Sequence, residues 1–321
     1  MRAAVRSIYG SSDVLTIEEI EPPSIGDDEV LVEVRAASVN PADVFMLTGE
    51  PRIVRLAAGL RRPRARGVGA DFAGVITEVG AKVSGFSVGD EVFGEGPQGS
   101  FAEYRRVNQK HIAIKPDGVT FENAAALPMA GGTALTILRA ARIARGQRVL
   151  VIGASGGIGS FAVQLAVSNG ADVTGVCSTA NVDLVRSLGA KEVFDYTKEN
   201  FVQAGEKWDV ILDLIADRTL AELCSVLAPN GTLVLCSGSG SKWFGPLGRM
   251  AAGGLRSMLT KARIVSPAAS PNNADLSTLA ELAASGAISP VIDRVVPLGE
   301  IRQALDRVHS RRARGKVVIS I

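Results

Sequence analysis

The sequence has few of the side chains that bind metals or form disulfides. Its 321 residues include three cysteines and two histidines. Cys177, Cys224 and Cys236 lie far apart and form no CxxC pair, which argues against a disulfide framework and a four-cysteine zinc site. We expect free cysteines, buried as small apolar side chains in a reducing compartment. His111 and His309 are expected on the surface or in strands, and not as metal ligands.

Strong net charge and long apolar runs are also absent. The formal net charge of +2 at pH 7 is too small to indicate a nucleic-acid or membrane partner by itself. No apolar run approaches the roughly 18 residues that span a bilayer, and the N-terminal sequence turns polar too early for a signal peptide. We therefore expect a cytoplasmic protein with no nucleic-acid partner and no membrane partner. Aromatic residues make up only 5%, and Ala, Val and Gly suit close packing of helices on a sheet.

Two kinds of pattern divide the chain. Residues 1–121 show short strand-like runs with frequent glycine turns, which is typical of a small β-rich domain resembling a barrel. Over 122–285, near-continuous apolar runs such as "RVLVIG" and "DVILDLI" alternate with helical segments. That alternation predicts an α/β fold with a doubly wound parallel sheet of the Rossmann type. Strand-like sequence returns over 286–321, and we expect this tail to complete the first domain.

A glycine-rich segment, "GASGGIG" at 153–159, follows the first of these apolar runs and precedes a helical pattern. Glycine allows a sharp turn and a close approach of the backbone to a pyrophosphate, and a helix N-terminus offers free N–H groups. The segment therefore predicts a dinucleotide site, with a purely structural turn as the alternative. The predicted cofactor contacts in it are Gly153, Ala154, Ser155, Gly156, Gly157, Ile158 and Gly159.

The second apolar run ends in Cys177, Ser178 and Thr179 and not in an acid. Sites for NAD usually carry Asp or Glu here to bind the ribose hydroxyls. Without an acid, nothing at this position repels a 2′-phosphate, and Ser178, Thr179 and Asn181 can donate hydrogen bonds to it. Arg186 can supply positive charge. We therefore predict NADPH as the cofactor, with Cys177, Ser178, Thr179 and Asn181 as contacts. Helix capping by the two hydroxyls is a compatible alternative.

The motifs "NPADVFMLTG", "GADFAGVITEVG", "FSVGDEVFG", "GASGGIG" and "LGAKEVFDYT" follow one another along nearly the whole chain. In this order they resemble the medium-chain dehydrogenase/reductase superfamily, and within it the zinc-independent, zeta-crystallin-like quinone oxidoreductases. The resemblance implies a GroES-like catalytic domain at 1–121, completed by 286–321. It also implies a Rossmann domain at 122–285, a cofactor in the cleft between the two domains, and a homodimer.

Zinc-dependent members of this superfamily hold catalytic zinc with a Cys, a Gly-His-Glu segment and a later Cys or Asp. Here Asn40 stands at the first position, and Ala70 and Asp71 stand in the second. The four-cysteine lobe of the structural zinc is absent as well. Zinc needs thiolate or imidazole ligands in sufficient number, so we predict no metal.

The same resemblance implies three catalytic residues. It places Asn40 and Asp43 near the nicotinamide, and Thr133 against the nicotinamide and its ribose. An Asx-type turn at "NPAD" and a helix cap at Thr133 are the structural alternatives. Phe45 occupies a position where related quinone reductases often carry tyrosine, so a tyrosyl proton donor is missing, and the sequence identifies no other general acid.

Further cofactor contacts follow from the resemblance. Tyr196 matches a tyrosine that packs near the 2′-phosphate. Asn181 stands where some relatives carry lysine, which weakens the grip on that phosphate. Ser237 and Gly238 are expected to border the nicotinamide. Lys316, in "RGKVVIS", matches a family motif, with a lysine on a strand edge as the alternative interpretation.

Two segments are rich in basic residues. Residues 52–66 contain six arginines, which form either a solvated loop or a lid that recruits anionic substrates or cofactor phosphates. Residues 242–263 mix basic and apolar side chains. We expect this segment, including Trp243 and Phe244, to line an apolar substrate pocket or the subunit interface. A peripheral membrane role near lipid quinones is a further interpretation.

The sequence thus predicts a zinc-independent, NADPH-dependent reductase that transfers hydride to a small electrophile, either a quinone or an α,β-unsaturated carbonyl. Reduction of an enoyl thioester, or interconversion of an aldehyde and an alcohol, is the alternative within the same superfamily. A non-catalytic NADPH-binding sensor or structural protein is the alternative outside enzymes, because a fold alone does not establish turnover.

Overall fold

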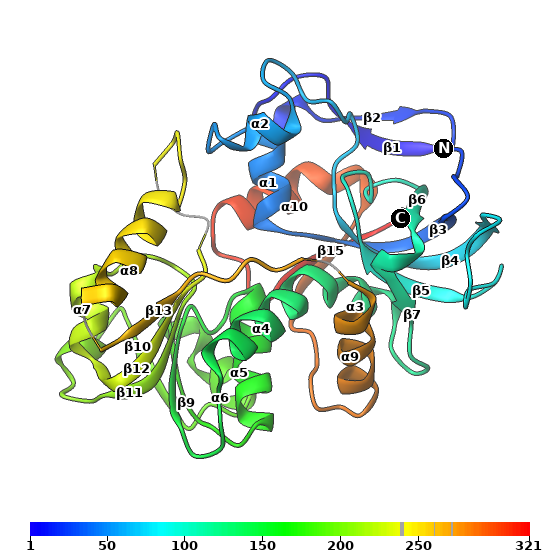
Figure 1. Ribbon diagram of the computed structural model, residues 1–321. Helices are drawn as coiled ribbons and strands as arrows, with labels where there is room; N and C mark the ends of the chain where they lie inside the picture. The colour runs from blue at the N-terminus through cyan, green and yellow to red at the C-terminus, as the bar shows by residue number, and fades with distance from the viewer. Residues whose placement is uncertain (238–240, 260, 271) are drawn as a thin grey trace. The chain divides into compact units, whose positions relative to one another are not determined.

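The structure is a computed structural model that describes residues 1–237, 241–259, 261–270 and 272–321 (Figure 1). The chain divides into two compact units. The first comprises Met1–Gly132 with Ser270–Ile321, and the second comprises Thr133–Ala269. The boundaries expected from the sequence were instead after residue 121 and before residue 286. The difference arises because α3 (Phe121–Ala126) packs on β3 and β4, and α9 (Asn273–Ala284) packs on β7, so both helices belong with the first unit.

The first unit is built on a mixed sheet in the order β14-β15-β3-β4-β5-β7, with β6 paired to β3. The C-terminal strand β15 lies between β14 and β3, antiparallel to β3, so the tail of the chain is an interior part of this sheet. The strands are β3 (Glu29–Val39), β4 (Asp71–Val79), β5 (Glu91–Glu95), β6 (Tyr104–Asn108), β7 (Ile112–Ile114), β14 (Ile292–Pro297) and β15 (Lys316–Ser320). A separate antiparallel pair is formed by β1 (Arg2–Val5) and β2 (Thr16–Glu19).

Helices cover this sheet through apolar faces. In α10 (Ile301–His309), the buried residues Ile301, Ala304 and Leu305 follow the spacing of one helix face. They pack in a core with residues such as Phe72 and Phe101, whose rings are almost fully buried. The unit also contains α1 (Pro41–Thr48), α2 (Val54–Ala58), and the short helices η1 (Ser12–Val14), η2 (Gln109–His111) and η5 (Leu298–Glu300). Helix α4 (Pro128–Ala141) starts in this unit and continues into the second.

The second unit contains a six-stranded parallel sheet in the order β10-β9-β8-β11-β12-β13. Counted along the unit, this is the order 3-2-1-4-5-6 of a dinucleotide-binding fold, so the predicted doubly wound α/β sheet is confirmed. The strands are β8 (Arg148–Ile152), β9 (Asp172–Cys177), β10 (Glu192–Asp195), β11 (Trp208–Asp213), β12 (Leu227–Leu235) and β13 (Arg263–Val265). The remaining helices are α5 (Gly157–Ser168), η3 (Thr179–Asn181), α6 (Val182–Ser187), η4 (Phe201–Gln203), α7 (Leu220–Ser225) and α8 (Leu247–Leu259).

Three aromatic rings fill one part of the second core. Phe194, Phe201 and Trp208 meet edge to face, with ring centroids 6.1 to 6.5 Å apart. The Trp208 indole is fully buried and donates a hydrogen bond of 3.3 Å to the Thr174 hydroxyl on β9. This cluster ties β10 and β11 together at the amino end of β11, so it supports the sheet whose opposite end carries the cofactor turn.

Replacing Trp208 with alanine is expected to lower the free energy of unfolding by about 3–5 kcal/mol, because it leaves a cavity among the rings. Urea unfolding followed by circular dichroism measures the change. Trp243→Ala is the matched control, since the Trp243 side chain is 59% exposed and its loss should cost less than about 0.5 kcal/mol. Equal losses from both substitutions would contradict the description of this core.

Candidate active site

The glycine-rich turn joins β8 to α5 at the carboxyl end of the parallel sheet. Gly153 has a φ of 88°, a conformation that side-chain-bearing residues rarely adopt. A Cβ atom at Gly159 would collide with the Gly153 carbonyl oxygen and would lie 2.9 Å from the Ala154 Cα. Because α5 begins at Gly157, the free N–H groups and partial positive charge of a helix N-terminus lie beside this turn. These features together fit a pyrophosphate.

Polar side chains connect this turn to the end of the second strand. Asn181 Nδ2 donates to Ser155 Oγ at 3.1 Å and to Ser178 Oγ at 3.2 Å. Asn181 Oδ1 is buried and accepts no hydrogen bond from the described residues. An oxygen in that position is an available acceptor for a ligand hydroxyl. The structure therefore brings Ser155, Ser178 and Asn181, three of the predicted cofactor contacts, into one cluster.

An acid that the sequence analysis missed lies beside this cluster. Asp195 ends β10 and is paired in register with Cys177 at the end of β9. Its carboxylate accepts a 2.6 Å hydrogen bond from Thr179 Oγ1 and a 2.7 Å hydrogen bond from Thr197 Oγ1. Those bonds, the Thr179 bond first, lower the pKa of Asp195 to about 2. The Thr179 hydroxyl proton is thus donated to Asp195 and not to a ligand. The neighbouring Tyr196 is 55% exposed.

The sequence contains a signal that could have identified Asp195. The "FDYT" segment places Asp195 directly before Tyr196, but at the end of the third strand of the unit, where the fingerprint does not look for an acid. Lys198 Nζ lies 3.4 Å from the same carboxylate with its side chain 67% exposed. The positive charge of Lys198 therefore lies beside the negative charge of Asp195 at the exposed side of this polar cluster.

The same carboxyl edge of the parallel sheet carries a buried ion pair at the end of β11. Asp213 ends β11 with its side chain 1% exposed, and Arg249 on α8 contacts it at 2.6 Å. Asp213 also accepts the Ala216 N–H at 2.9 Å, while Arg249 donates to the Arg218 carbonyl at 2.7 Å. Ser237 follows β12 and donates to the Ile215 carbonyl at 3.2 Å. The ion pair therefore holds α8 against the loop that follows β11.

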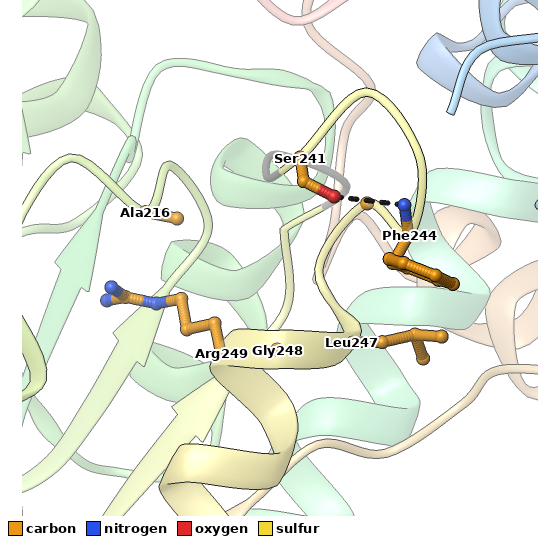
Figure 2. Close-up of a pocket in the computed structure, with 7 residues that line it drawn as sticks. Ala216, Ser241, Phe244, Leu247, Gly248 and Arg249 are labelled. Carbon is orange, nitrogen blue, oxygen red and sulfur yellow. Dashed lines mark hydrogen bonds between the residues drawn. The ribbon is translucent and has the colours of Figure 1, made fainter. Parts of the chain in front are cut away.

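A pocket of about 520 Å³ lies beside this ion pair. Figure 2 shows Phe244 and Leu247 on one side of it and Arg249 pointing the other way, toward Ala216. Ser241 Oγ accepts the Phe244 N–H at 3.0 Å and so closes the turn before α8. The lining residues are Ala216, Ser241, Phe244, Gly245, Leu247, Gly248 and Arg249. Trp243 is exposed next to this pocket in sequence and is not among its lining residues, and Gly238 lies outside the described residues.

The first unit holds a buried polar cluster around Lys316. The Lys316 ammonium contacts Asn40 Oδ1 and lies 3.5 Å from Asp71 Oδ2. Asn40 Nδ2 donates to the same Asp71 oxygen at 2.9 Å, and Ser38 Oγ donates to it at 3.1 Å. All four residues are buried. Since β15 is an interior strand, the interpretation of Lys316 as a strand-edge lysine is wrong.

Asp43 joins this cluster from the first turn of α1. Its Oδ2 accepts the Asn40 N–H at 2.8 Å, which caps the helix, and its Oδ1 accepts a 3.1 Å bond from Gln98. Burial, with a smaller contribution from the nearby Asp71, raises the pKa of Asp43 to about 6. Burial also raises the pKa of Asp71, and the Lys316 ammonium opposes that effect. The cluster can therefore hold a proton near neutral pH.

Two further charged groups adjoin the cluster. Burial, with Asp71 and Asp43 adding to it, raises the pKa of Glu95 to about 8. Burial lowers the pKa of Arg105 to about 10, and its guanidinium donates to the Ala70 carbonyl at 2.9 Å. Three carboxyl groups thus face two cations, which leaves one carboxyl group without a counter-charge when all are ionised. Glu95 and Arg105 have no motif in the sequence that marks them as part of a site.

The position of the catalytic zinc in zinc-dependent relatives is chemically different here. Asn40 and Asp71 supply an amide and a carboxylate, and both are committed to the Lys316 ammonium. Zinc prefers thiolate and imidazole ligands, and a buried ammonium repels a second cation. These residues do not fit a zinc ion. Over residues 1–237, 241–259, 261–270 and 272–321, no three His, Cys, Asp or Glu side chains gather as a metal site.

The other predicted residues are distributed as follows. Phe45 is half-buried on α1, two residues beyond Asp43. Thr133 lies inside α4 and not at its end, so the cap interpretation is wrong. It belongs to the second unit, whereas Asn40 and Asp43 belong to the first. Burial raises the pKa of the Cys177 thiol to about 11, so this predicted contact is a neutral thiol at physiological pH.

The arginine-rich segment is largely solvated. Arg61, Arg62 and Arg64 are exposed. Arg55 donates to the Gly49 carbonyl at 3.0 Å, and Arg66 pairs with Glu18 at 2.8 Å on the surface. Surface pairs of this kind contribute at most about 1 kcal/mol to stability. The observed contacts favour the solvated-loop interpretation over a lid.

The buried carboxyl groups predict how stability depends on pH. An acid with a higher pKa in the folded than in the unfolded chain binds more protons when folded, so stability falls as pH rises between the two values. For Asp43 that interval runs from 3.8 to about 6. Asp43→Asn should flatten the decline there by up to about 1.4 kcal/mol per pH unit, measured by urea unfolding at several pH values.

Asp117→Asn is the control for this prediction, because it removes an exposed carboxylate from the same unit. It should reproduce the pH profile of the unchanged protein. A profile of Asp43→Asn that is parallel to the unchanged protein over the whole interval would show that the pKa of Asp43 is the same in the folded and unfolded chains, which would contradict the prediction.

Comparison with known families and proteins extends this description. Residues 26–117 match the family described as alcohol dehydrogenase GroES-like domain, and residues 188–319 match the family described as zinc-binding dehydrogenase. The GroES-like match lies within the first unit. The second match begins directly after α6 and ends within β15, so it includes parts of both units.

Full-length relatives agree with these matches. The chain is 34% identical over 333 residues to 2-methylene-furan-3-one reductase of Solanum lycopersicum, covering 99% of this chain and 79% of that protein. It is 34% identical, with the same coverage, to the chloroplastic NADPH-dependent alkenal/one oxidoreductase of Arabidopsis thaliana. Among solved structures, the quinone oxidoreductase from Coxiella burnetii matches with a TM-score of 0.88 at 26% identity, covering 100% of this chain and 99% of that one. Similarity of this extent establishes the family: the chain belongs to the medium-chain dehydrogenase/reductase superfamily, in its quinone oxidoreductase branch.

Proposed function

We propose that this protein is an NADPH-dependent oxidoreductase that transfers hydride to an α,β-unsaturated carbonyl or a quinone without a metal ion. The observation that carries the proposal is the glycine turn between β8 and α5, in a parallel sheet of dinucleotide-binding order. The names of the relatives support the acceptor class, since two describe the reduction of conjugated carbonyl compounds and one describes quinones.

NADPH supplies the hydride when it is bound. We assign its pyrophosphate to the turn at 153–159, where glycine leaves room for the backbone to approach a phosphate. Ser178 and Tyr196 are assigned to the 2′-phosphate, with Lys198 as the adjacent cation. The unpartnered Asn181 Oδ1 suits a ribose hydroxyl, because it needs a donor.

The nicotinamide end of the proposed site uses a residue of α4 and a residue that follows β12. We assign Thr133 and Ser237 to the nicotinamide on the strength of the sequence resemblance. Phe45 and Trp243 do not line the apolar pocket beside α8 and remain predictions from the sequence. The acceptor is assigned to that pocket, whose apolar side chains include Phe244 and Leu247. These side chains bind and orient an apolar acceptor and exclude water from it.

Hydride addition to a conjugated carbonyl leaves negative charge on its oxygen, and a hydrogen-bond donor or a proton must meet that charge. We assign this task to the buried cluster of the first unit. Asp43, with its pKa near 6, holds a proton in part of the population at neutral pH. Asn40, held by Asp71 and Lys316, is the fixed polar neighbour. A conjugated acceptor is already electrophilic, so a hydrogen bond or proton from these residues to its carbonyl oxygen is sufficient without a metal ion.

We further propose that the protein is located in the cytoplasm and forms a homodimer. Three free cysteines support a reducing compartment, although the Arabidopsis relative is named as chloroplastic. No helix in the part of the chain that the structure describes is long and apolar enough to cross a membrane.

The proposal predicts NADPH oxidation by the purified protein with a small para-quinone and with a simple enone, unchanged by a zinc chelator. Absorbance at the NADPH band measures the rate. Gly159→Ala should lower NADPH affinity at least about tenfold, because the added Cβ displaces the turn. Gly254→Ala is the control, since open space surrounds Gly254. Tight NADPH binding with no oxidation by any acceptor would support a sensor instead, and loss of activity with chelator would contradict a metal-free reaction.

Replacing Ser178 with an acidic residue tests the proposed preference for NADPH over NADH. Ser178→Glu should raise the dissociation constant of NADPH at least about tenfold through repulsion of the 2′-phosphate, while that of NADH changes about threefold or less. Titration of reduced-nicotinamide fluorescence measures both constants. Ser187→Glu adds the same charge at an exposed position on α6 and should change neither. An equal change for both cofactors would place the 2′-phosphate away from Ser178.

A further inference from the structure

Helix α8 turns an apolar face outward. Its exposed positions carry no charged or hydrogen-bonding side chain in the part of the helix whose burial is described. Leu255 is 60% exposed and Met258 is 83% exposed, and with Leu247 they fall on one side of a helix. The exposed positions are Leu247, Gly248, Ala251, Ala252, Gly254, Leu255 and Met258. A helix on the surface of a soluble unit normally shows the opposite arrangement.

The polar side chains of α8 point inward and are engaged. Arg249 pairs with the buried Asp213 at 2.6 Å, and Figure 2 shows it pointing away from Leu247 and Phe244. Ser257 Oγ donates to the Ala262 carbonyl at 3.0 Å and accepts the Ile264 N–H at 3.1 Å. Rotating α8 to bury its leucines would break these bonds and leave Asp213 as an uncompensated buried charge, which is strongly unfavourable. The ion pair therefore maintains the outward direction of the apolar face.

Residues before the helix extend this apolar surface. Phe244 is 62% exposed and lies beside Leu247 in Figure 2, and Trp243 is also exposed. We call Trp243, Phe244, Leu247, Leu255 and Met258 the α8 face. Exposed leucine, methionine and aromatic side chains gathered in one place mark an interaction surface and not a solvated one.

Charge identifies the kind of partner. The sequence contains no Asp or Glu from 223 to 274 and five basic residues in that span. Lys242, in the segment before α8, and Lys261, just after it, are exposed. A second copy of this face would bring like charges together. An anionic surface would pair with the lysines while the apolar side chains enter it.

We propose that the α8 face docks this protein onto the surface of an anionic lipid membrane. An apolar helix face with tryptophan beside it and lysines before and after it is suited to the interfacial region of a bilayer, where the helix lies in the membrane plane. From the sequence, a peripheral membrane role was only one interpretation of residues 242–263, and the outward direction of α8, which only the structure shows, is what favours it. Docking would bring the pocket of about 520 Å³ close to acceptors dissolved in the bilayer; this consequence alone rests on the proposed function.

Vesicle binding of the purified full chain tests the proposal without cofactor or acceptor. The protein should sediment with vesicles of equal parts phosphatidylcholine and phosphatidylglycerol. It should bind phosphatidylcholine vesicles less, and release from the anionic ones in about 1 M sodium chloride, where the Debye length is about 3 Å. Brominated lipid should quench Trp243, since the other tryptophan, Trp208, is fully buried.

Two double variants distinguish binding through the α8 face from non-specific hydrophobic adsorption. Leu255→Ser with Met258→Ser should weaken vesicle binding at least about tenfold. Ile8→Ser with Val88→Ser removes two apolar side chains that are 60% and 65% exposed elsewhere, and should leave binding unchanged. Absence of sedimentation with the anionic vesicles would overturn the proposal. So would equal loss of binding in both double variants, or a dimer of the unchanged protein that the first double variant converts to a monomer, since the face would then be a subunit interface.

Discussion

The ammonium group of Lys316 holds the polar centre of the first unit together. It contacts Asn40 and approaches Asp71, residues that are 276 and 245 positions away along the chain. Asn40 precedes α1, Asp71 begins β4, and the Met129 N–H at the start of α4 donates to the Asp71 carboxylate at 3.3 Å. Without this cation, two carboxylates would remain in a buried site with only hydrogen bonds to offset their desolvation.

That arrangement also explains how the unit manages without zinc ligands. The Lys316 ammonium, on the C-terminal strand, contacts the buried Asn40 amide and lies 3.5 Å from the Asp71 carboxylate. The proton affinity of the site then depends on burial and on mutual repulsion of carboxylates. These are the causes that raise the pKa values of Asp43 and Glu95. A conjugated acceptor suits such a site, since it needs a proton or hydrogen bond more than a strong Lewis acid.

The second unit shows a related use of a buried ion pair. Asp213 and Arg249 tie α8 to the end of β11, and the pair commits the polar side of that helix to the interior. The same contact therefore shapes the pocket beside Phe244 and exposes the apolar side of α8. One ion pair links the proposed acceptor site to the proposed membrane surface, so a change in the position of α8 would affect both.

The sequence by itself determined the local features. The α/β alternation, the glycine turn at 153–159 and the absence of cysteine and histidine at the zinc positions all follow from short segments, because strand, turn and ligand chemistry are local properties. Only the tertiary structure decided which distant groups meet. Lys316 with Asn40 and Asp71, Thr179 with Asp195, and Arg249 with Asp213 are partners across long stretches of chain. A periodic pattern also indicates that a helix has two faces, but not which face turns inward; in α8 a buried carboxylate made that choice, because leaving a charge unpaired costs more than exposing leucine and methionine.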